Sequence, residues 1–207
     1  MNDYRIARIK QAVKFFQPLI FTVMIFTGCL AHAQNGTYEL KNSNGSYGLI
    51  SVVKKQNHIT AEIFAWWNTP SAQTGSYYGQ GILINNHTLL KSSENDPDCG
   101  VSLALNDHAI TAKFENCTTD HLPEDFNGTY RKISEATAGD YIVMADKSFF
   151  YSRPDGKSKQ KSYVVKGNTV SFNLDGGAKG NWVFVHYRNT KDKDTAGYVK
   201  LTDLEKL

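Results

Sequence analysis

The sequence has 207 residues, of which 41% are hydrophobic and 21% charged, and its formal net charge is +3. Residues 1–33 hold four basic residues and one acidic residue, so residues 34–207 carry equal numbers of both signs and no net charge. A nucleic-acid-binding protein normally shows a basic footprint, so the composition argues against that class. The length is sufficient for two small domains.

The first 33 residues have the three parts of a secretory signal peptide. A basic segment at 1–14 precedes an apolar run, and the small-residue sequence Ala31-His32-Ala33 follows. The apolar run of about fourteen residues is too short to span a bilayer. We therefore expect cleavage after Ala33 and export to the periplasm of a Gram-negative bacterium. The alternative is lipid attachment at Cys29, which follows a loose lipobox and would anchor the protein to a membrane.

Residues 34–207 show no convincing helical periodicity. Short apolar or alternating runs are separated at close intervals by glycine, asparagine and serine, which is typical of all-β sandwiches and small barrels. The clearest of these runs are 47–53, 58–64, 81–84, 141–144 and 182–187.

The sequence Asn-Gly-Thr-Tyr opens this region at 35–38 and recurs at 127–130. One interpretation is that the two copies mark the first and last strands of one barrel, lying side by side. The alternative is that Asn-Gly turns recur in any β protein.

Large aromatic residues flank a polar loop at 68–76: Trp66 and Trp67 precede it, and Tyr77 and Tyr78 follow it. Tryptophan and tyrosine contribute large contact areas at binding surfaces. Consecutive strand residues face opposite sides, so one of the two tryptophans should belong to the core. We expect at least one exposed ring, and we hypothesise that these four residues form a partner-binding site.

Two alternating runs, 101–105 and 110–114, are separated by the polar triplet 106–108, which predicts a β-hairpin with one buried face. Cys99 stands just before the first run and Cys117 just after the second. The hairpin would bring these two cysteines together, and an oxidising compartment would favour a disulfide bond between them.

Around this hairpin the sequence reads C-x-x-x-L-x-L and then I-x-A-x-F-x-x-C, followed by F-x-G-x-Y-R-K, over residues 99–132. The pattern is similar to that of small β domains in Gram-negative periplasmic proteins, including lysozyme-inhibitor-like ones. This resemblance implies an exported β domain more than it implies a particular function.

A run of small and polar residues at 134–140 suggests a linker between a disulfide-pinned domain, 34–133, and a second domain, 141–207. The charge also changes there, because residues 34–138 hold 7 basic and 11 acidic residues, whereas residues 139–207 hold 12 and 8. We expect few contacts across the linker and independent folding of the two parts.

In the second part, F-Y-S-R-P at 150–154 is followed by K-G-N-T-V at 166–170, N-W-V-F-V at 181–185 and A-G-Y-V-K at 196–200. Residues 141–204 thereby resemble the bacterial SH3-like (SH3b) domain, although the opening differs and a tyrosine replaces the last tryptophan. The resemblance implies a small β-barrel that binds peptidoglycan peptides or a protein partner, and it does not imply catalysis. The face that it implies consists of Tyr151, Trp182 and Tyr198.

Motifs for catalysis or metal binding are weak. The sequence contains no G-x-S-x-G, H-E-x-x-H, P-loop or dinucleotide motif, and the histidines lack metal-ligand spacing. The acidic segment 94–98 suggests either a calcium site or, more simply, a solvated loop. We expect no metal, no cofactor and no enzymatic activity. The histidines of residues 34–207 are His58, His87, His108, His121 and His186.

These features predict a non-enzymatic binding protein. The first hypothesis is an inhibitor or immunity protein that neutralises a secreted cell-wall hydrolase or toxin protein. The second is a peptidoglycan-binding or envelope-sensing module that acts through the SH3-like domain. A hydrolase with no recognisable motif is the third.

Overall fold

The structure is a computed structural model that describes residues 34–106, 108–189 and 192–207. The proposed signal peptide and Cys29 lie outside these residues. The described residues form sixteen β-strands and three short 3-10 helices, which confirms the all-β prediction. No helix within the described ranges is long and apolar enough to cross a membrane.

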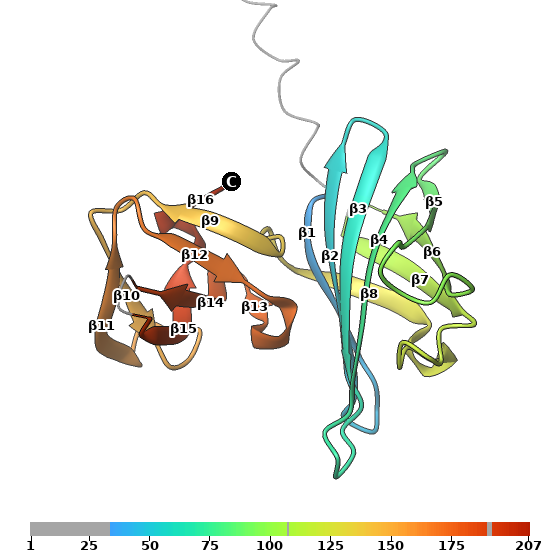
Figure 1. Cartoon of the computed structure of the whole chain (residues 1–207), viewed down its shortest axis with the longest axis horizontal. Helices are drawn as coiled ribbons and strands as arrows, with labels where there is room; N and C mark the ends of the chain where they lie inside the picture. The colour runs from blue at the N-terminus through green and yellow to red at the C-terminus, as the bar shows by residue number, and fades with distance from the viewer. Residues whose placement is uncertain (1–33, 107, 190–191) are drawn as a thin grey trace, which may run out of the picture. The chain divides into compact units, whose positions relative to one another are not determined.

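The first sheet contains eight strands in the order β4-β3-β2-β1-β8-β7-β6-β5 (Figure 1). Reciprocal backbone hydrogen bonds between Gln80 and Lys91, at 2.9 and 2.8 Å, link the two end strands and give the sheet a barrel-like form. The strands are β1 (Gly36–Lys41), β2 (Tyr47–Lys55), β3 (His58–Trp66), β4 (Thr74–Ile82), β5 (His87–Leu90), β6 (Gly100–Leu105), β7 (Ala109–Glu115) and β8 (Gly128–Ser134), with the 3-10 helix η1 (Glu124–Phe126) before β8.

Strands β1 and β8 are neighbours, with Tyr38 opposite Lys132 and Glu39 opposite Arg131. These strands contain the two Asn-Gly-Thr-Tyr sequences, apart from their asparagines. The prediction that the first and last strands of the domain pair side by side is therefore confirmed.

Side chains fill the interior of the barrel that the first sheet forms, as expected of eight strands. Alternate residues of β3 and β7 point inward, and three large phenols, those of Tyr38, Tyr77 and Tyr130, are buried among them. Each phenol donates a hydrogen bond to a backbone carbonyl: Tyr38 to Gln34 at 2.9 Å, Tyr77 to Leu90 at 3.3 Å and Tyr130 to Phe126 at 2.9 Å. Buried polar groups of this kind need such partners.

Burial, reinforced by the charge of Glu135, raises the pKa of Tyr38 to about 12. An unfolded tyrosine titrates near pH 10, so the unfolded chain loses this proton first as the pH rises. The stability contributed by the neutral phenol is thus fully present below about pH 10 and is lost as the pH rises from about 10 to 12. Urea unfolding at pH 8, 10 and 11 should show this loss, and Tyr38→Phe should lose less stability than the wild type. An identical decline in both proteins would contradict the assignment.

The hairpin of β6 and β7 places Val101 opposite Phe114 and Leu103 opposite Ala112, with their side chains buried. Cys99 and Cys117 form a disulfide bond, with their Cα atoms 4.5 Å apart. The predicted hairpin and disulfide are both confirmed.

The second sheet has the order β11-β10-β15-β14-β12-β9-β16, and β13 pairs with β14. Its core is a separate cluster that includes Phe150, Phe172 and Val185. The strands are β9 (Gly139–Val143), β10 (Lys147–Tyr151), β11 (Lys159–Val165), β12 (Thr169–Phe172), β13 (Ala178–Lys179), β14 (Trp182–Arg188), β15 (Asp194–Lys200) and β16 (Leu204–Lys206), with the 3-10 helices η2 (Leu174–Gly176) and η3 (Leu201–Asp203).

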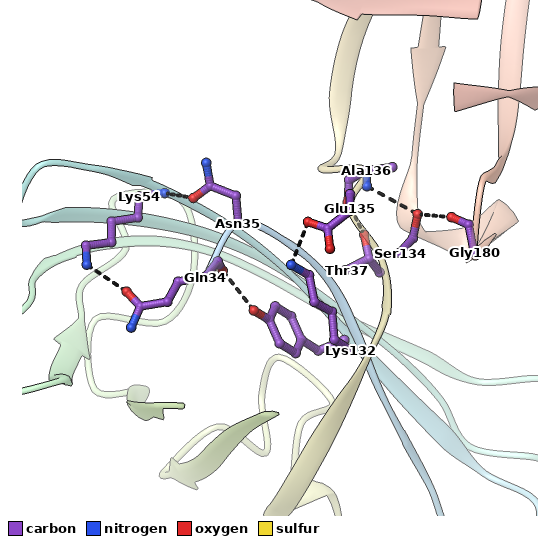
Figure 2. Close-up of polar contacts among 10 residues, drawn as sticks. Gln34, Asn35, Thr37, Lys54, Lys132, Ser134, Glu135, Ala136 and Gly180 are labelled. Atoms are coloured by element: carbon purple, nitrogen blue, oxygen red, sulfur yellow. Dashed lines mark hydrogen bonds and ion pairs between the residues drawn. The ribbon is translucent and has the colours of Figure 1, made fainter. Parts of the chain in front are cut away.

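The segment expected to be a linker forms a packed junction between β8 and β9. Ala136 and Thr137 are buried, and the carbonyl of Ala136 accepts a hydrogen bond of 2.7 Å from the hydroxyl of Thr37. The hydroxyl of Ser134 donates to the carbonyl of Gly180 at 2.7 Å (Figure 2). Small residues are needed here because they fit into a crowded junction, which is a different role from that of a flexible tether.

Residues 34–207 form one compact unit. Leu49 of β2 is buried in the core cluster of the second sheet, and Phe64 packs against that cluster. Independent folding of the two parts stays a prediction, and a fragment that ends before the second sheet would expose Leu49 to water.

Candidate functional site

Three neighbouring strands of the second sheet, β10, β15 and β14, carry aromatic side chains on one face. In β14, Val183 and Val185 point into the core, and period-two alternation therefore places Trp182 and Phe184 on the opposite face. Across the sheet, Phe184 pairs with Tyr198.

The sequence-predicted residues Tyr151, Trp182 and Tyr198 are brought together on this face. Tyr151 pairs with Tyr198 across the strands, and the rings of Tyr151 and Trp182 lie 4.8 Å apart at an interplanar angle of 70°. Sequence reasoning missed Phe184, whose ring is 5.2 Å from that of Tyr198. We call these four half-buried residues, Tyr151, Trp182, Phe184 and Tyr198, the aromatic face.

The helix η2 lies against one end of the aromatic face. The hydroxyl of Tyr198 donates a hydrogen bond of 3.3 Å to the carbonyl of Gly176. A Cβ atom on Gly176 would come within 2.3 Å of the Phe184 ring, so a side chain there would displace that ring. Burial raises the pKa of Tyr198, which keeps its phenol neutral and able to donate. The face is therefore held in a fixed arrangement.

Two lysines lie near aromatic rings in this part of the second sheet. The Nζ atom of Lys200 lies 6.0 Å from the centre of the Trp182 ring. The Nζ atom of Lys159, in β11, lies 3.5 Å from the centre of the Phe149 ring in β10. Ammonium groups above aromatic rings are attracted to the electron-rich face, by about 0.5–1 kcal/mol at exposed sites.

The four aromatic residues beside the 68–76 loop do not converge. Trp66 packs against Tyr47, with ring centres 5.6 Å apart and an interplanar angle of 40°, whereas Trp67 packs on Phe126 at 6.0 Å. The indole nitrogen of Trp67 also donates to the carbonyl of His121 at 2.9 Å. The two tryptophans thus lie in different environments, as expected for consecutive residues at the end of a strand. Neither ring is among the exposed large hydrophobic side chains of the described residues.

Tyr77 requires a correction. Its side chain is only 2% exposed, because alternation along β4 turns it into the interior while Tyr78 remains half-buried at the surface. Tyr77 is a core residue in this structure, so it is not available to contact a partner.

The loop is exposed at Pro70, Ser71 and Ala72, as the sequence predicted. It is shorter than expected, because residues 74–76 begin β4 and Gly75 is buried. It is also tied to its neighbours, because the side-chain amide of Asn68 donates to the carbonyl of Asn44 at 2.7 Å. A polar but pinned loop is suited to forming a rigid surface.

Side chains of the acidic segment 94–98 link β4 to the segment after β7 through hydrogen bonds. The side-chain oxygen of Asn95 accepts a hydrogen bond from the backbone N–H of Tyr78 at 3.0 Å, and its nitrogen donates to Asp120 at 2.9 Å. The carboxylate of Asp96 accepts from the hydroxyl of Thr119 at 2.6 Å, a bond that lowers the pKa of Asp96. The side chains of Asn95 and Asp96 therefore make hydrogen bonds within the protein. The described part of the chain contains no group of three or more histidine, cysteine or acidic side chains placed to hold a metal ion.

The five histidines named in the sequence analysis lie at separate places on the surface. All five are exposed, and they include His186, which lies 5.5 Å from Phe184. They do not come together at one place.

No family model, curated protein or solved structure matches this chain.

Proposed function

We propose that the protein is a non-catalytic binding protein of the bacterial cell envelope, and that it docks its partner on the aromatic face. The observation that supports this proposal is the convergence of Tyr151, Trp182 and Tyr198 on adjacent strands. Tryptophan and tyrosine are the residues most enriched at binding hot spots, and rings held by the sheet lose little entropy on binding.

Peptidoglycan is the partner that best fits this face. Its sugars offer apolar ring surfaces for the aromatic side chains, and its peptides carry carboxylates for Lys200 beside Trp182. The excess of basic residues in 139–207 favours such an anionic ligand. The SH3-like sequence pattern points to the same class of partner.

Retention on purified sacculi tests the proposal. The change Trp182→Ala should weaken retention about thirtyfold, because truncation of a hot-spot residue typically costs about 2 kcal/mol or more. Binding is measured by co-sedimentation over a range of sacculus concentrations, with circular dichroism to confirm folding.

Trp66→Ala is the matched control, since it removes a half-buried tryptophan from the first sheet and should leave retention unchanged. If the folded Trp182→Ala protein is retained on sacculi as strongly as the wild type, the aromatic face is not the docking surface.

The second candidate is an inhibitor or immunity protein that neutralises a peptidoglycan-degrading enzyme. It is favoured by the pinned loop, because the bond from Asn68 to Asn44 orders that loop before any partner arrives. Co-purification of a secreted wall-degrading enzyme with the protein, reduced by Asn68→Ala and unaffected by Trp182→Ala, would favour this function over wall binding.

A further inference from the structure

Strand β11 lies at one end of the second sheet, so one of its edges has no neighbouring strand among the described residues. Its alternate residues, from Lys159 and Lys161 to Tyr163 and Val165, are exposed, while Val164 points into the core. Tyr163 is 47% exposed and Val165 is 40% exposed, so the strand offers apolar as well as basic surface. We call this exposed row the β11 edge.

The β11 edge continues onto β10 through aromatic contacts. Phe149 is the cross-strand neighbour of Tyr163, with ring centres 5.7 Å apart. The ammonium group of Lys147 lies 3.7 Å from the centre of the Tyr163 ring, and that of Lys159 covers the Phe149 ring. Contacts with these aromatic rings therefore hold the side chains of Lys147 and Lys159 in place.

Within the described residues, no carboxylate forms an ion pair with Lys147, Lys159 or Lys161. The ion pairs of the described residues involve other lysines and arginines. An anionic group could therefore approach the three ammonium groups without breaking an existing salt bridge.

Lysines on an edge strand also prevent unwanted pairing between sheets, and this explains part of the pattern. A second copy of the chain that paired through β11 in the register that aligns Lys159 with Lys161 would bring lysines against lysines, which is unfavourable for directly opposed strands. The same charges attract a strand whose carboxylates lie opposite them. The spacing of two residues between Lys159 and Lys161 matches the period of any extended strand.

We propose that the β11 edge accepts an extended acidic segment of a partner protein as an added strand. Carboxylates at alternate positions of that segment face Lys159 and Lys161, and an apolar side chain packs on Tyr163. The N–H and C=O of Val165 bond to Asn168. The main-chain hydrogen bonds to the added strand therefore come from the outer edge of β11 before Val165, as in other cases of strand addition. This site uses a different strand from Trp182, and it does not depend on wall binding.

A synthetic seven-residue peptide tests the proposal. It has glutamate at two successive alternate positions, valine at the next alternate position and threonine elsewhere, and glutamine replaces glutamate in the control peptide. The full chain should bind the glutamate peptide and not the glutamine peptide. Binding should slow hydrogen exchange of the β11 amides and weaken with added salt. The double change Lys159→Gln, Lys161→Gln should weaken binding roughly tenfold.

Lys55→Gln, Lys91→Gln is the matched control, since it removes two exposed positive charges from the first sheet. It should leave peptide binding unchanged. Equal losses in both double variants, or binding without protection of β11 amides, would overturn strand addition in favour of non-specific charge attraction. Failure of the glutamate peptide to bind, or equally tight binding of an eight-nucleotide oligothymidine, would also overturn it. Trp182→Ala should retain peptide binding, so this result is separable from sacculus retention.

Discussion

Replacing both Cys99 and Cys117 with serine should lower the free energy of unfolding by about 2–4 kcal/mol. The bond joins residues 18 positions apart, so it restricts the unfolded chain around the β6–β7 hairpin. It also holds the start of β6 against the end of β7, close to the hydrogen bonds of Asn95 with Asp120 and of Asp96 with Thr119. Urea unfolding of the oxidised wild type and the double variant measures the difference.

Reduction of the wild type with dithiothreitol should give the same loss as the double substitution, whereas the variant should not respond to the reductant. Oxidised wild type should contain no thiol at positions 99 and 117 that reacts with Ellman's reagent. Reactive thiols at these positions in the folded protein would contradict the bond.

Tyr77→Ala should lower the free energy of unfolding by about 3–5 kcal/mol, as large aromatic truncations in cores do. The side chain is 2% exposed and lies in the interior of the first sheet, where its hydroxyl bonds to the carbonyl of Leu90. Thermal and urea unfolding, compared with those of the wild type, give the magnitude.

Tyr77→Phe is the control, because it keeps the ring and removes only the hydroxyl. It should cost about 0.5–1.5 kcal/mol, the usual net value of one hydrogen bond. A Tyr77→Ala protein that melts like the wild type would show that the ring lies outside the core, and it would restore Tyr77 as a candidate contact residue.

Local features of the sequence were sufficient for much of the fold. The alternation of Val101, Leu103 and Leu105 predicts which face of β6 is buried, because strand periodicity depends only on near neighbours. The Cys99–Cys117 pair follows from the same hairpin. The trio Tyr151, Trp182 and Tyr198 was implied by the resemblance of residues 141–204 to the SH3-like domain, and the structure puts these residues on one face.

Other features depend on contacts that no local pattern encodes. The small residues at 134–140 resemble a linker in composition, yet Thr37 binds Ala136 across 99 residues and Ser51 accepts from the backbone N–H of Ala138 across 87. For the pair Tyr77 and Tyr78, alternation shows that the two rings face opposite sides and does not show which is inside. That choice was made by the register of β4 against β3, which places Tyr77 opposite the buried Ile63.

The pairing of β1 with β8 determines the order in which the chain can fold. Strand β1 is synthesised before the other strands of its sheet, but its second neighbour exists only after the whole domain has been made. Bringing Thr37 to Ser134 closes a long loop, and folding is slow when such distant contacts must form. The β6–β7 hairpin needs no such closure, so its disulfide can form while β1 still has one open edge. The last step of barrel formation should then be the docking of β8 onto β1, which leaves the folding chain vulnerable to association through that edge until β8 has docked.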